Sequence, residues 1–330
     1  MKAFFKLVVV GGLAASLWLV YALGDPKSPG GQTFVSLKPG SSTRAIANEL
    51  ARAGVIHSSG AFLVLHAFAG RRMLKAGEYA FDRPANAFEI YDRLERGDVY
   101  RKTVVVPEGF NMFDVALALE AAKLCTREEF LAAARSDAAL VSDLDPQARS
   151  LEGYLFPDTY SFGRNQKPHD LAAAMVKRFR KEAAALGLKP GDDVHRIVTL
   201  ASIVEKETAA PSERPLVASV FVNRLKVGMG LATDPSVIYA ALLAGRYNGV
   251  IHQSDLAFDS PYNTYRYAGL PPGPIANPGR ASLDAAMHPA RSDYLYFVAN
   301  NQGGHNFART LDEHNHNVVI YRQGMGPGKR

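Results

Sequence analysis

The sequence has a single cysteine, Cys125, in 330 residues, and this scarcity excludes an intrachain disulfide. The cysteine lies in an alanine-rich helical stretch, where we expect a small buried hydrophobic side chain. Lysine and arginine form no block, so the formal charge of +6 favours anionic surroundings but argues against a nucleic-acid partner. Neither a Gly-x-Ser-x-Gly nor a His-Glu-x-x-His motif occurs, which argues against the hydrolases built on those motifs.

Charge is also missing from residues 7–24, LVVVGGLAASLWLVYALG. An uncharged apolar run of about 18 residues is long enough to span a membrane as a helix. Lys2 and Lys6 precede the run, so the positive-inside rule places the N-terminus in the cytoplasm and the rest of the chain outside it. A cleaved signal peptide that ends at Ala22 and Gly24 is the alternative, but the length of the run favours a retained anchor.

The remaining length suggests two or three folding units. Residues 25–32 are rich in glycine and proline and predict a short linker. Residues 33–103 predict a strand, two helices, a second strand and a third helix. The same order recurs further along when Gly109 is aligned with Gly40, which we interpret as a duplicated unit, although two similar helical patterns can also match by chance.

Two glutamates, Glu205 and Glu207, close an apolar helical run that begins near residue 192. The helical repeat places them about 160° apart, and apolar residues surround most of the helix, so at least one carboxyl lies at the edge of a dry environment. Burial raises the pKa of a carboxyl and can keep it protonated near neutral pH, as a general acid requires. The alternatives are that both side chains emerge into solvent, or that one forms a structural ion pair with Arg214 or Arg224.

The loop at residues 263–279, NTYRYAGLPPGPIANPG, has the composition of a glycan-binding cleft. Its tyrosine rings can stack on the apolar faces of sugars, and its asparagine side chains can bind hydroxyl and amide groups. Its prolines can hold the loop in place without a helix or a sheet.

Eight motifs between residues 150 and 317 together resemble the MltG (YceG-like) endolytic murein transglycosylases, which are membrane-anchored enzymes that cut nascent peptidoglycan. The motifs are LEGYLFPDTY, ASIVEKET, ERPLVASVFVNRL, TDPSVIYA, YNTY, GLPPGPIANPG, HPARSDYLYFVA and GGHNFARTLDEHN. The resemblance implies an α+β protein with an N-terminal transmembrane helix, a small LysM-like domain and a larger mixed α/β catalytic domain. The implied boundaries are 1–24 for the anchor, 25–32 for the linker, 33–103 for the LysM-like domain and 104–330 for the YceG-like catalytic domain.

The resemblance also implies a location and partners. We expect a single-pass protein of the cell inner membrane, anchored through residues 7–24, with a cytoplasmic N-terminus and a periplasmic catalytic domain. The expected substrate is the peptidoglycan glycan strand, and penicillin-binding proteins and other elongation machinery are the expected protein partners. No cofactor and no metal are implied.

The implied reaction is a lyase reaction in which the first glutamate of the EKET motif, Glu205, is the catalytic acid. This acid protonates the glycosidic oxygen between N-acetylmuramic acid and N-acetylglucosamine within the strand. Its carboxylate then takes the proton of the muramic C6 hydroxyl, which attacks its own anomeric carbon and leaves a 1,6-anhydromuramic end. One carboxyl suffices because the nucleophile is part of the substrate. Cleavage of this kind would terminate the elongation of new glycan chains.

Five further residues are candidates for contact with the substrate or for support of the acid: Glu152, Asn263, Tyr265, Glu207 and His305. Each has a structural alternative. Glu152 could cap a helix or form a salt bridge, and Asn263 and Tyr265 could stabilise their own loop. Glu207 is expected to be structural or supporting, and His305 to be a polar residue in a tight turn near the cleft.

Asp234 and the C-terminal histidines predict structure rather than chemistry. Asp234 precedes Pro235 and is expected to cap the helix that follows. His314 and His316 are two residues apart, so on a helix they point about 200° from each other and cannot share a metal ion.

Two other functions remain open on the sequence. A non-catalytic scaffold could use the same surfaces to bind glycan and recruit synthases, and a hydrolase could cut the same bond by adding water. The mass of the products separates the two enzymes, because the lyase product lacks the added water.

Overall fold

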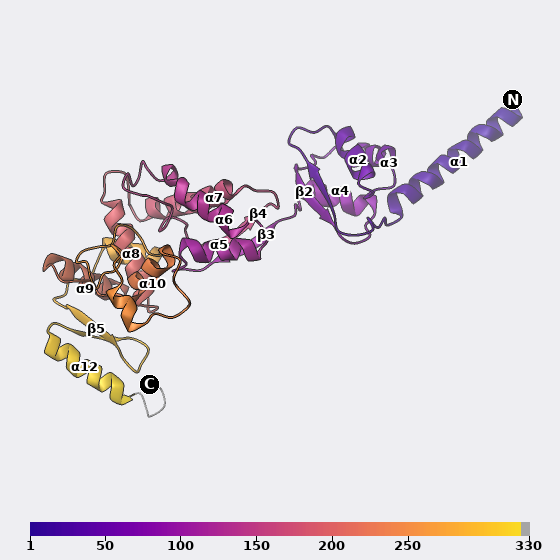
Figure 1. Ribbon diagram of the computed structural model, residues 1–330. Helices are drawn as coiled ribbons and strands as arrows, with labels where there is room; N and C mark the ends of the chain where they lie inside the picture. The colour runs from indigo at the N-terminus through magenta and orange to yellow at the C-terminus, as the bar shows by residue number, and fades with distance from the viewer. Residues whose placement is uncertain (325–330) are drawn as a thin grey trace. The chain divides into compact units, whose positions relative to one another are not determined.

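The computed structural model describes residues 1–324 and forms two compact units, Met1–Lys102 (unit 1) and Thr103–Arg330 (unit 2). Each unit mixes helices with short strands (Figure 1), and this confirms the predicted α+β class.

Unit 1 opens with the helix α1 (Lys2–Gly24), which is long and apolar enough to cross a membrane. Its apolar side chains are exposed along most of its length, as in Leu7, Leu13 and Val20. The C-terminal end of the helix is packed, with Ala22 and Leu23 in the core of unit 1 and Leu19 partly buried against it. The helix therefore projects from the unit (Figure 1), and its exposed apolar surface fits a single-pass anchor.

The rest of unit 1 consists of β1 (Thr33–Leu37), α2 (Thr43–Arg52), α3 (Ser59–Phe68), β2 (Gly77–Phe81) and α4 (Ala87–Arg96). The two strands pair antiparallel, with Val35 opposite Tyr79. Side-chain oxygens cap all three helices by accepting a backbone N–H, as Ser42 does from Ala45. The buried faces of the helices pack on the sheet and give unit 1 a core of its own.

Unit 2 repeats this order of elements. Its first half contains β3 (Lys102–Val106), α5 (Met112–Ala121), α6 (Arg127–Ser136), a short 3₁₀ helix η1 (Ala138–Leu140), β4 (Asp158–Phe162) and α7 (Pro168–Ala185). The strands β3 and β4 pair with each other, as β1 and β2 do in unit 1. Apart from η1, the first half of unit 2 and the part of unit 1 that follows α1 share the strand–helix–helix–strand–helix order that the sequence predicts.

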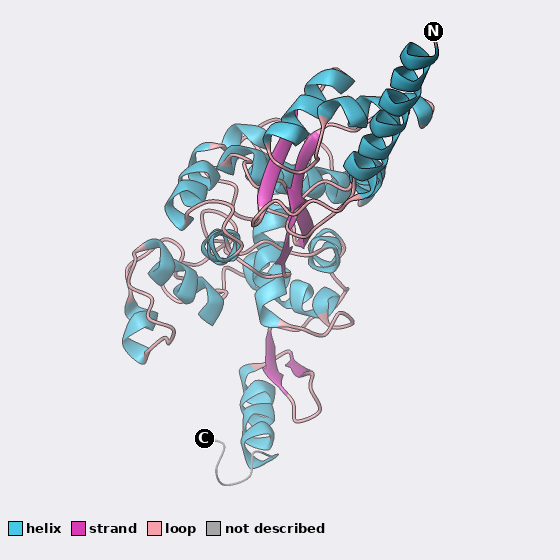
Figure 2. Ribbon diagram, turned by 90° about the vertical axis from the view of Figure 1, so that its right-hand side faces the viewer, coloured by secondary structure: helices cyan, strands magenta, loops and turns pink. Residues whose placement is uncertain are grey.

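The second half of unit 2 is mainly helical (Figure 2). It contains α8 (Val194–Glu207), α9 (Arg214–Lys226), α10 (Asp234–Leu243), the 3₁₀ helix η2 (Gln253–Ala257), α11 (Arg280–Met287), β5 (Tyr296–Ala299), β6 (His305–Ala308) and α12 (Leu311–Gly324). The antiparallel β5–β6 hairpin packs against α12. Helix α8 is buried on nearly all sides, as its apolar composition predicts.

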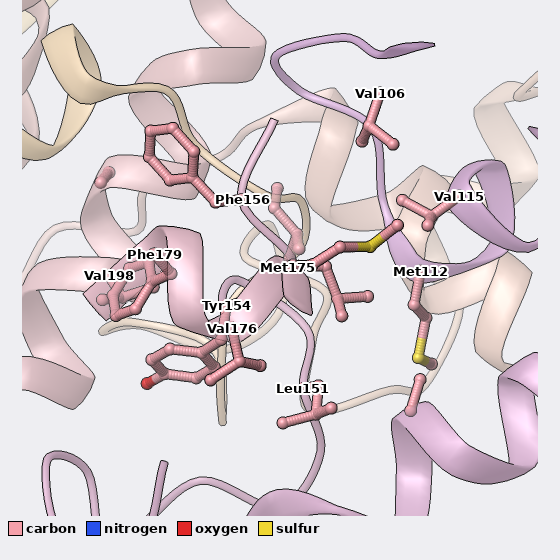
Figure 3. Close-up of a cluster of buried hydrophobic side chains, with 14 of the residues drawn as sticks. Val106, Met112, Val115, Leu151, Tyr154, Phe156, Met175, Val176, Phe179 and Val198 are labelled. Carbon is pink, nitrogen blue, oxygen red and sulfur yellow. The ribbon is translucent and has the colours of Figure 1, made fainter. Parts of the chain in front are cut away.

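One hydrophobic core joins the two halves of unit 2. Tyr154 and Phe179 meet edge to face in this core, with ring centroids 5.0 Å apart, and Figure 3 shows them beside Val198 of α8. The core therefore fixes α8, the helix that carries both glutamates, against the repeated half of the unit.

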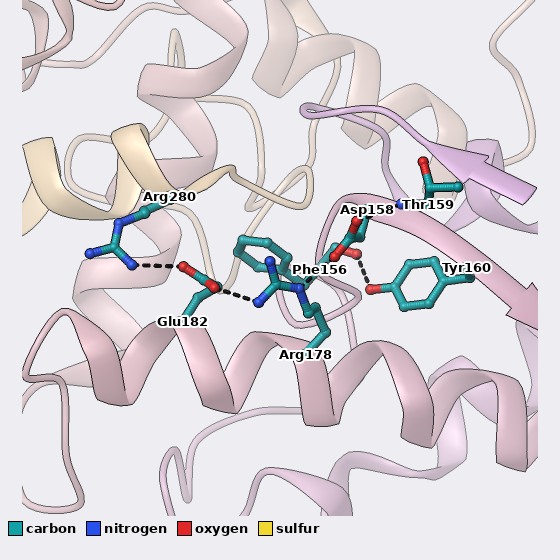
Figure 4. Close-up of polar contacts among 7 residues, drawn as sticks. All are labelled: Phe156, Asp158, Thr159, Tyr160, Arg178, Glu182 and Arg280. Carbon is teal, nitrogen blue, oxygen red and sulfur yellow. Dashed lines mark hydrogen bonds and ion pairs between the residues drawn. The ribbon is translucent and has the colours of Figure 1, made fainter.

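A chain of ion pairs ties three elements together at the edge of this core (Figure 4). Arg178 of α7 binds Asp158 of β4 and Glu182 of its own helix. Glu182 also accepts a hydrogen bond from Arg280 at 2.7 Å, which fixes the start of α11. These contacts hold the N-terminus of α11 in place, next to Gly279, whose N–H donates to Glu205.

Candidate active site

A cavity of about 520 Å³ lies in unit 2 and is called here the Glu207 cavity. Residues from α8, α9, α10, β5 and α12 surround it, together with the loop before α10 and Tyr265. Its polar lining consists of Lys206, Glu207, Arg224, Thr233, Asp234, Tyr265 and His314, and its remaining lining is Phe221, Met229, Leu231, Ala232, Pro235, Tyr296, Phe297 and Leu311. The size and the mixed lining are those of a small-molecule or glycan subsite.

Glu207 is the last residue of α8 and is partly buried in this cavity. Burial, followed by the negative charge of Asp234, raises the pKa of Glu207 to about 7, and the positive charge of Arg224 opposes the rise. A carboxyl with this pKa holds its proton through a large part of the neutral range. Glu207 therefore has the protonation behaviour that a general acid requires.

Tyr265 and Asp234 form a hydrogen-bonded pair on the cavity wall. The Tyr265 hydroxyl donates to Asp234 Oδ1 at 2.7 Å, and burial and this bond raise the pKa of the tyrosine. The predicted helix cap at Asp234 is wrong by one residue, because α10 begins at Asp234 and Thr233 occupies the N-cap position. The Asp234 carboxylate instead orients the tyrosine and keeps negative charge near Glu207.

Arg224 supplies the positive charge of the cavity. Its Nε donates to the Leu295 carbonyl at 2.7 Å and its Nη1 to the Leu231 carbonyl at 2.6 Å. Its guanidinium lies over the Tyr296 ring, 5.5 Å from the centroid. Burial lowers the pKa of Arg224, but a guanidinium stays charged at any physiological pH. Arg224 is thus a fixed cation on the cavity wall.

One residue of the cavity wall has a strained backbone conformation that the sequence does not predict. Ala232 has φ of 50°, in the left-handed region that favours glycine. Its N–H donates to the Thr264 carbonyl at 3.1 Å, which joins the segment before α10 to the loop at residues 263–279, called here the tyrosine loop. Strained residues of this kind persist only where the surrounding structure holds them in place, and they are concentrated at functional sites.

Glu205 has a different environment from Glu207. Its Oε1 accepts from Arg214 Nη2 at 2.9 Å and its Oε2 from the Gly279 N–H at 2.9 Å. The side chains of Glu205 and Arg214 are 5% and 7% exposed, and Glu108 lies 3.4 Å from the same guanidinium. Glu205 is not among the described residues that line the cavity. Its contacts are those of the structural ion pair that the sequence left open as an alternative.

Glu152 is only 2% exposed and lies at the N-terminus of α5. It accepts the Met112 N–H at 2.9 Å and an N–H of the Asn277 amide at 3.1 Å. Burial raises the pKa of Glu152 to about 8, so the carboxyl is mainly protonated at neutral pH. It is not among the described residues that line the cavity, and its contacts fit the helix-capping alternative.

Asn263 and His305 are also occupied by contacts within the protein. Asn263 is fully buried, and its amide donates to the carbonyls of Leu256 and Phe258 at 3.0 and 2.8 Å. His305 is the first residue of β6, and its Nδ1 lies 2.6 Å from Glu213 Oε2. These contacts stabilise the tyrosine loop and the β5–β6 hairpin. Of the six residues that the sequence nominates, the structure brings Glu207 and Tyr265 to the cavity.

Arg224 was not predicted as a residue of the cavity, although the sequence names it as a possible ion-pair partner of one glutamate. Sequence reasoning also dismissed His314, which it considered only as a metal ligand. In the described part of the chain, no three His, Cys, Asp or Glu side chains come together in a way that could hold a metal ion. The only available signal was position, because Arg224 lies on the helix that follows the glutamates and His314 lies in the last quoted motif.

Comparison with known proteins shows the family to which this chain belongs. Residues 35–319 match the YceG-like family, so the chain belongs to that family. An endolytic murein transglycosylase of Bacillus subtilis is 35% identical over 300 residues, which are 85% of this chain and 82% of that protein.

Two further comparisons agree. An endolytic murein transglycosylase of Streptococcus pneumoniae strain D39 is 29% identical over 317 residues, which are 86% of this chain and 57% of that protein. The crystal structure of a YceG-like protein from Listeria monocytogenes is 34% identical and has a TM-score of 0.56, over 86% of this chain and 98% of that chain. This chain therefore spans little more than half of its streptococcal relative.

Proposed function

We propose that this protein is an endolytic peptidoglycan lytic transglycosylase that cleaves the bond between N-acetylmuramic acid and N-acetylglucosamine within glycan strands and leaves 1,6-anhydromuramic ends. The activity named for the Bacillus subtilis relative supports the substrate and the type of cut. The observation that carries the proposal is a cavity in which a carboxyl with a pKa of about 7 lies beside a tyrosine and a fixed arginine. Cleavage of this kind would terminate glycan elongation.

We assign the acid to Glu207, although the resemblance points to Glu205. A general acid must hold a proton and must reach a substrate. Glu207 meets both conditions, because burial and Asp234 favour its protonated form and its side chain lines the cavity. Glu205 is engaged by a buried guanidinium and a backbone N–H, and it is not among the described residues that line the cavity. The two assignments make opposite predictions for a matched pair of variants.

The proposed reaction moves one proton out of Glu207 and one proton back. Protonated Glu207 gives its proton to the glycosidic oxygen as the bond to the anomeric carbon breaks, and the N-acetylglucosamine end leaves as an alcohol. The muramic C6 hydroxyl attacks the anomeric carbon and gives its proton to the Glu207 carboxylate, so the acid is regenerated without water. Arg224 stabilises the transient carboxylate, and Asp234 favours return of the proton.

The remaining parts of the chain fit an enzyme held at a membrane surface. Helix α1 would anchor the protein in the cell inner membrane with its N-terminus in the cytoplasm, because Lys2 and Lys6 precede the apolar run, and the catalytic domain would then be periplasmic. We retain the proposed boundaries of 33–103 for a LysM-like domain and 104–330 for the catalytic domain. Penicillin-binding proteins and other elongation machinery remain the proposed partners on the resemblance alone.

Mass spectrometry of glycan digests tests the proposal. Full-length protein in detergent is incubated with uncross-linked peptidoglycan strands, and the wild type is compared with Glu207→Gln and Glu205→Gln. We expect anhydro-ended fragments of internal cleavage from the wild type, none from Glu207→Gln, and measurable cleavage from the folded fraction of Glu205→Gln.

Each contrary outcome has a definite meaning. Products that contain the added water would make the protein a hydrolase, and glycan binding without any cleavage would make it a scaffold. Full activity of Glu207→Gln together with an inactive, folded Glu205→Gln would return the acid to Glu205.

A further inference from the structure

His314 of α12 lines the Glu207 cavity but has no role in the reaction described above. Its Nδ1 is buried, and no described residue forms a hydrogen bond with that atom. Buried polar atoms in native proteins nearly always have partners, so an orphaned nitrogen on a cavity wall calls for an explanation. A ligand that enters the cavity is one source of the missing partner.

The ring of His314 is held by stacking rather than by hydrogen bonds. It lies against Tyr296 with centroids 5.2 Å apart and planes 24° apart. Arg224 packs on the same tyrosine and is itself fixed by two backbone carbonyls. The three side chains form one wall of the cavity, and its orientation is set by β5, α9 and α12 together.

The charge of the wall favours a neutral imidazole. Burial, followed by the positive charge of Arg224, lowers the pKa of His314. A neutral imidazole offers one N–H donor and one nitrogen acceptor. Hydroxyl and acetamido groups match this pair, because each can donate or accept a neutral hydrogen bond.

Two other histidines of the C-terminal segment, His305 and His316, lack the combination of a cavity position and an unpaired buried nitrogen that His314 has. Both His305 Nδ1 and the His305 backbone N–H are bonded to Glu213. His316 lies on the same helix, but it is exposed and is not among the described residues that line the cavity.

We propose that His314 is a substrate-binding residue whose imidazole forms a hydrogen bond with a hydroxyl or acetamido group of the glycan in the Glu207 cavity. This inference rests on the proposed function for the identity of the ligand. It makes α12 a part of the binding site, so the C-terminal helix acts in glycan recognition.

Four variants of the full-length protein in detergent test this role. His314→Ala removes the ring, His314→Phe keeps an aromatic ring for stacking without a polar atom, His314→Gln keeps a donor and an acceptor, and His316→Ala is the matched control. The Kd for uncross-linked glycan strands is measured in a Glu207→Gln background, and KM and kcat are measured with the wild-type glutamate. Thermal unfolding checks that each variant is folded.

We expect His314→Ala and His314→Phe to weaken glycan binding roughly three- to tenfold, the effect of one lost neutral hydrogen bond, and to raise KM more than they lower kcat. His314→Gln should recover part of the affinity, and His316→Ala should bind like the wild type. Unchanged binding by His314→Ala, or wild-type binding by His314→Phe, would overturn the inference. The Kd comparison does not require turnover, so an inactive wild type would refute the proposed function without deciding the role of His314.

Discussion

The two glutamates of α8 should respond in opposite ways to the same substitution by glutamine. In the folded protein the pKa of Glu207 is about 7, against an ordinary value of 4.5. The folded state therefore binds this proton more tightly than the unfolded state. The contribution that the proton on Glu207 makes to the stability of the wild type is present below about pH 4.5. This contribution is lost as the pH rises to about 7, because the charged carboxylate is disfavoured in the cavity.

The size of this effect follows from the shift. A difference of about 2.5 pKa units corresponds to about 3 kcal/mol at about 1.4 kcal/mol per unit, which is an upper limit for a partly buried group. Glutamine has no charge to desolvate. Glu207→Gln should therefore unfold much like the wild type near pH 4.5 and be more stable than it by up to about 3 kcal/mol at pH 8.

Glu205→Gln should destabilise the protein instead. The change removes the negative partner of Arg214, a guanidinium in a side chain that is 7% exposed, and leaves it only the longer contact with Glu108. Breaking a buried pair in this way costs about 3 kcal/mol or more.

Urea unfolding of the full-length protein in detergent at pH 4.5, 6 and 8 measures both effects, with the wild type as the reference at each pH. A Glu207→Gln variant that is less stable than the wild type at pH 8, or whose advantage in stability does not change with pH, would contradict the raised pKa of Glu207. Equal behaviour of the two variants would also refute the distinction between the glutamates.

Three further predictions concern other residues of unit 2. Glu152→Ala should lower the free energy of unfolding by at least about 2 kcal/mol, because a backbone N–H and the Asn277 amide lose their buried acceptor. Urea unfolding at pH 7 measures this free energy, and a value equal to that of the wild type within error would contradict the prediction. Ala232→Gly should raise the unfolding free energy by about 1 kcal/mol through relief of the positive φ, and a lower midpoint of thermal unfolding would count against it. Asp234→Asn removes a charge that raises the pKa of Glu207. The alkaline limb of the pH dependence of the cleavage rate should therefore move to lower pH by roughly 0.5–1 unit. An unchanged limb would show that Asp234 does not raise the pKa of Glu207.

The sequence predicted most of the elements because their signals are local. The patterns in residues 33–103 that predict two helices between two strands, and a third helix after them, lie within each short segment, and the structure contains α2, α3 and α4 in that order. The long uncharged run likewise predicts α1 without reference to any other part of the chain.

The choice between the glutamates could not be made from α8 alone. The helical repeat places Glu205 and Glu207 on nearly opposite sides, but it does not say which side faces a cavity. That depends on α9, which presents Arg214 to one glutamate and Arg224 near the other. Both arginines were named as possible partners, and only the packing of the helices separates their roles.

Asn263 and His314 are two further residues whose roles depend on contacts that their local sequence patterns do not predict. The composition of the tyrosine loop predicted an asparagine that binds glycan, but the Asn263 amide bonds to carbonyls five and seven residues away and so stabilises its own loop. His314 reaches the cavity from a helix more than a hundred residues after Glu207, a contact that no local pattern can predict.

The proton on Glu207 can be observed directly. Protein labelled with carbon-13 at the glutamate side-chain carboxyl is titrated by NMR, and the resonance that disappears in Glu207→Gln is followed from pH 4 to pH 9. We predict a midpoint near 7 for this carboxyl. A midpoint near the ordinary glutamate value would mean that the cavity does not hold the proton, and would contradict the assignment of Glu207 as the acid.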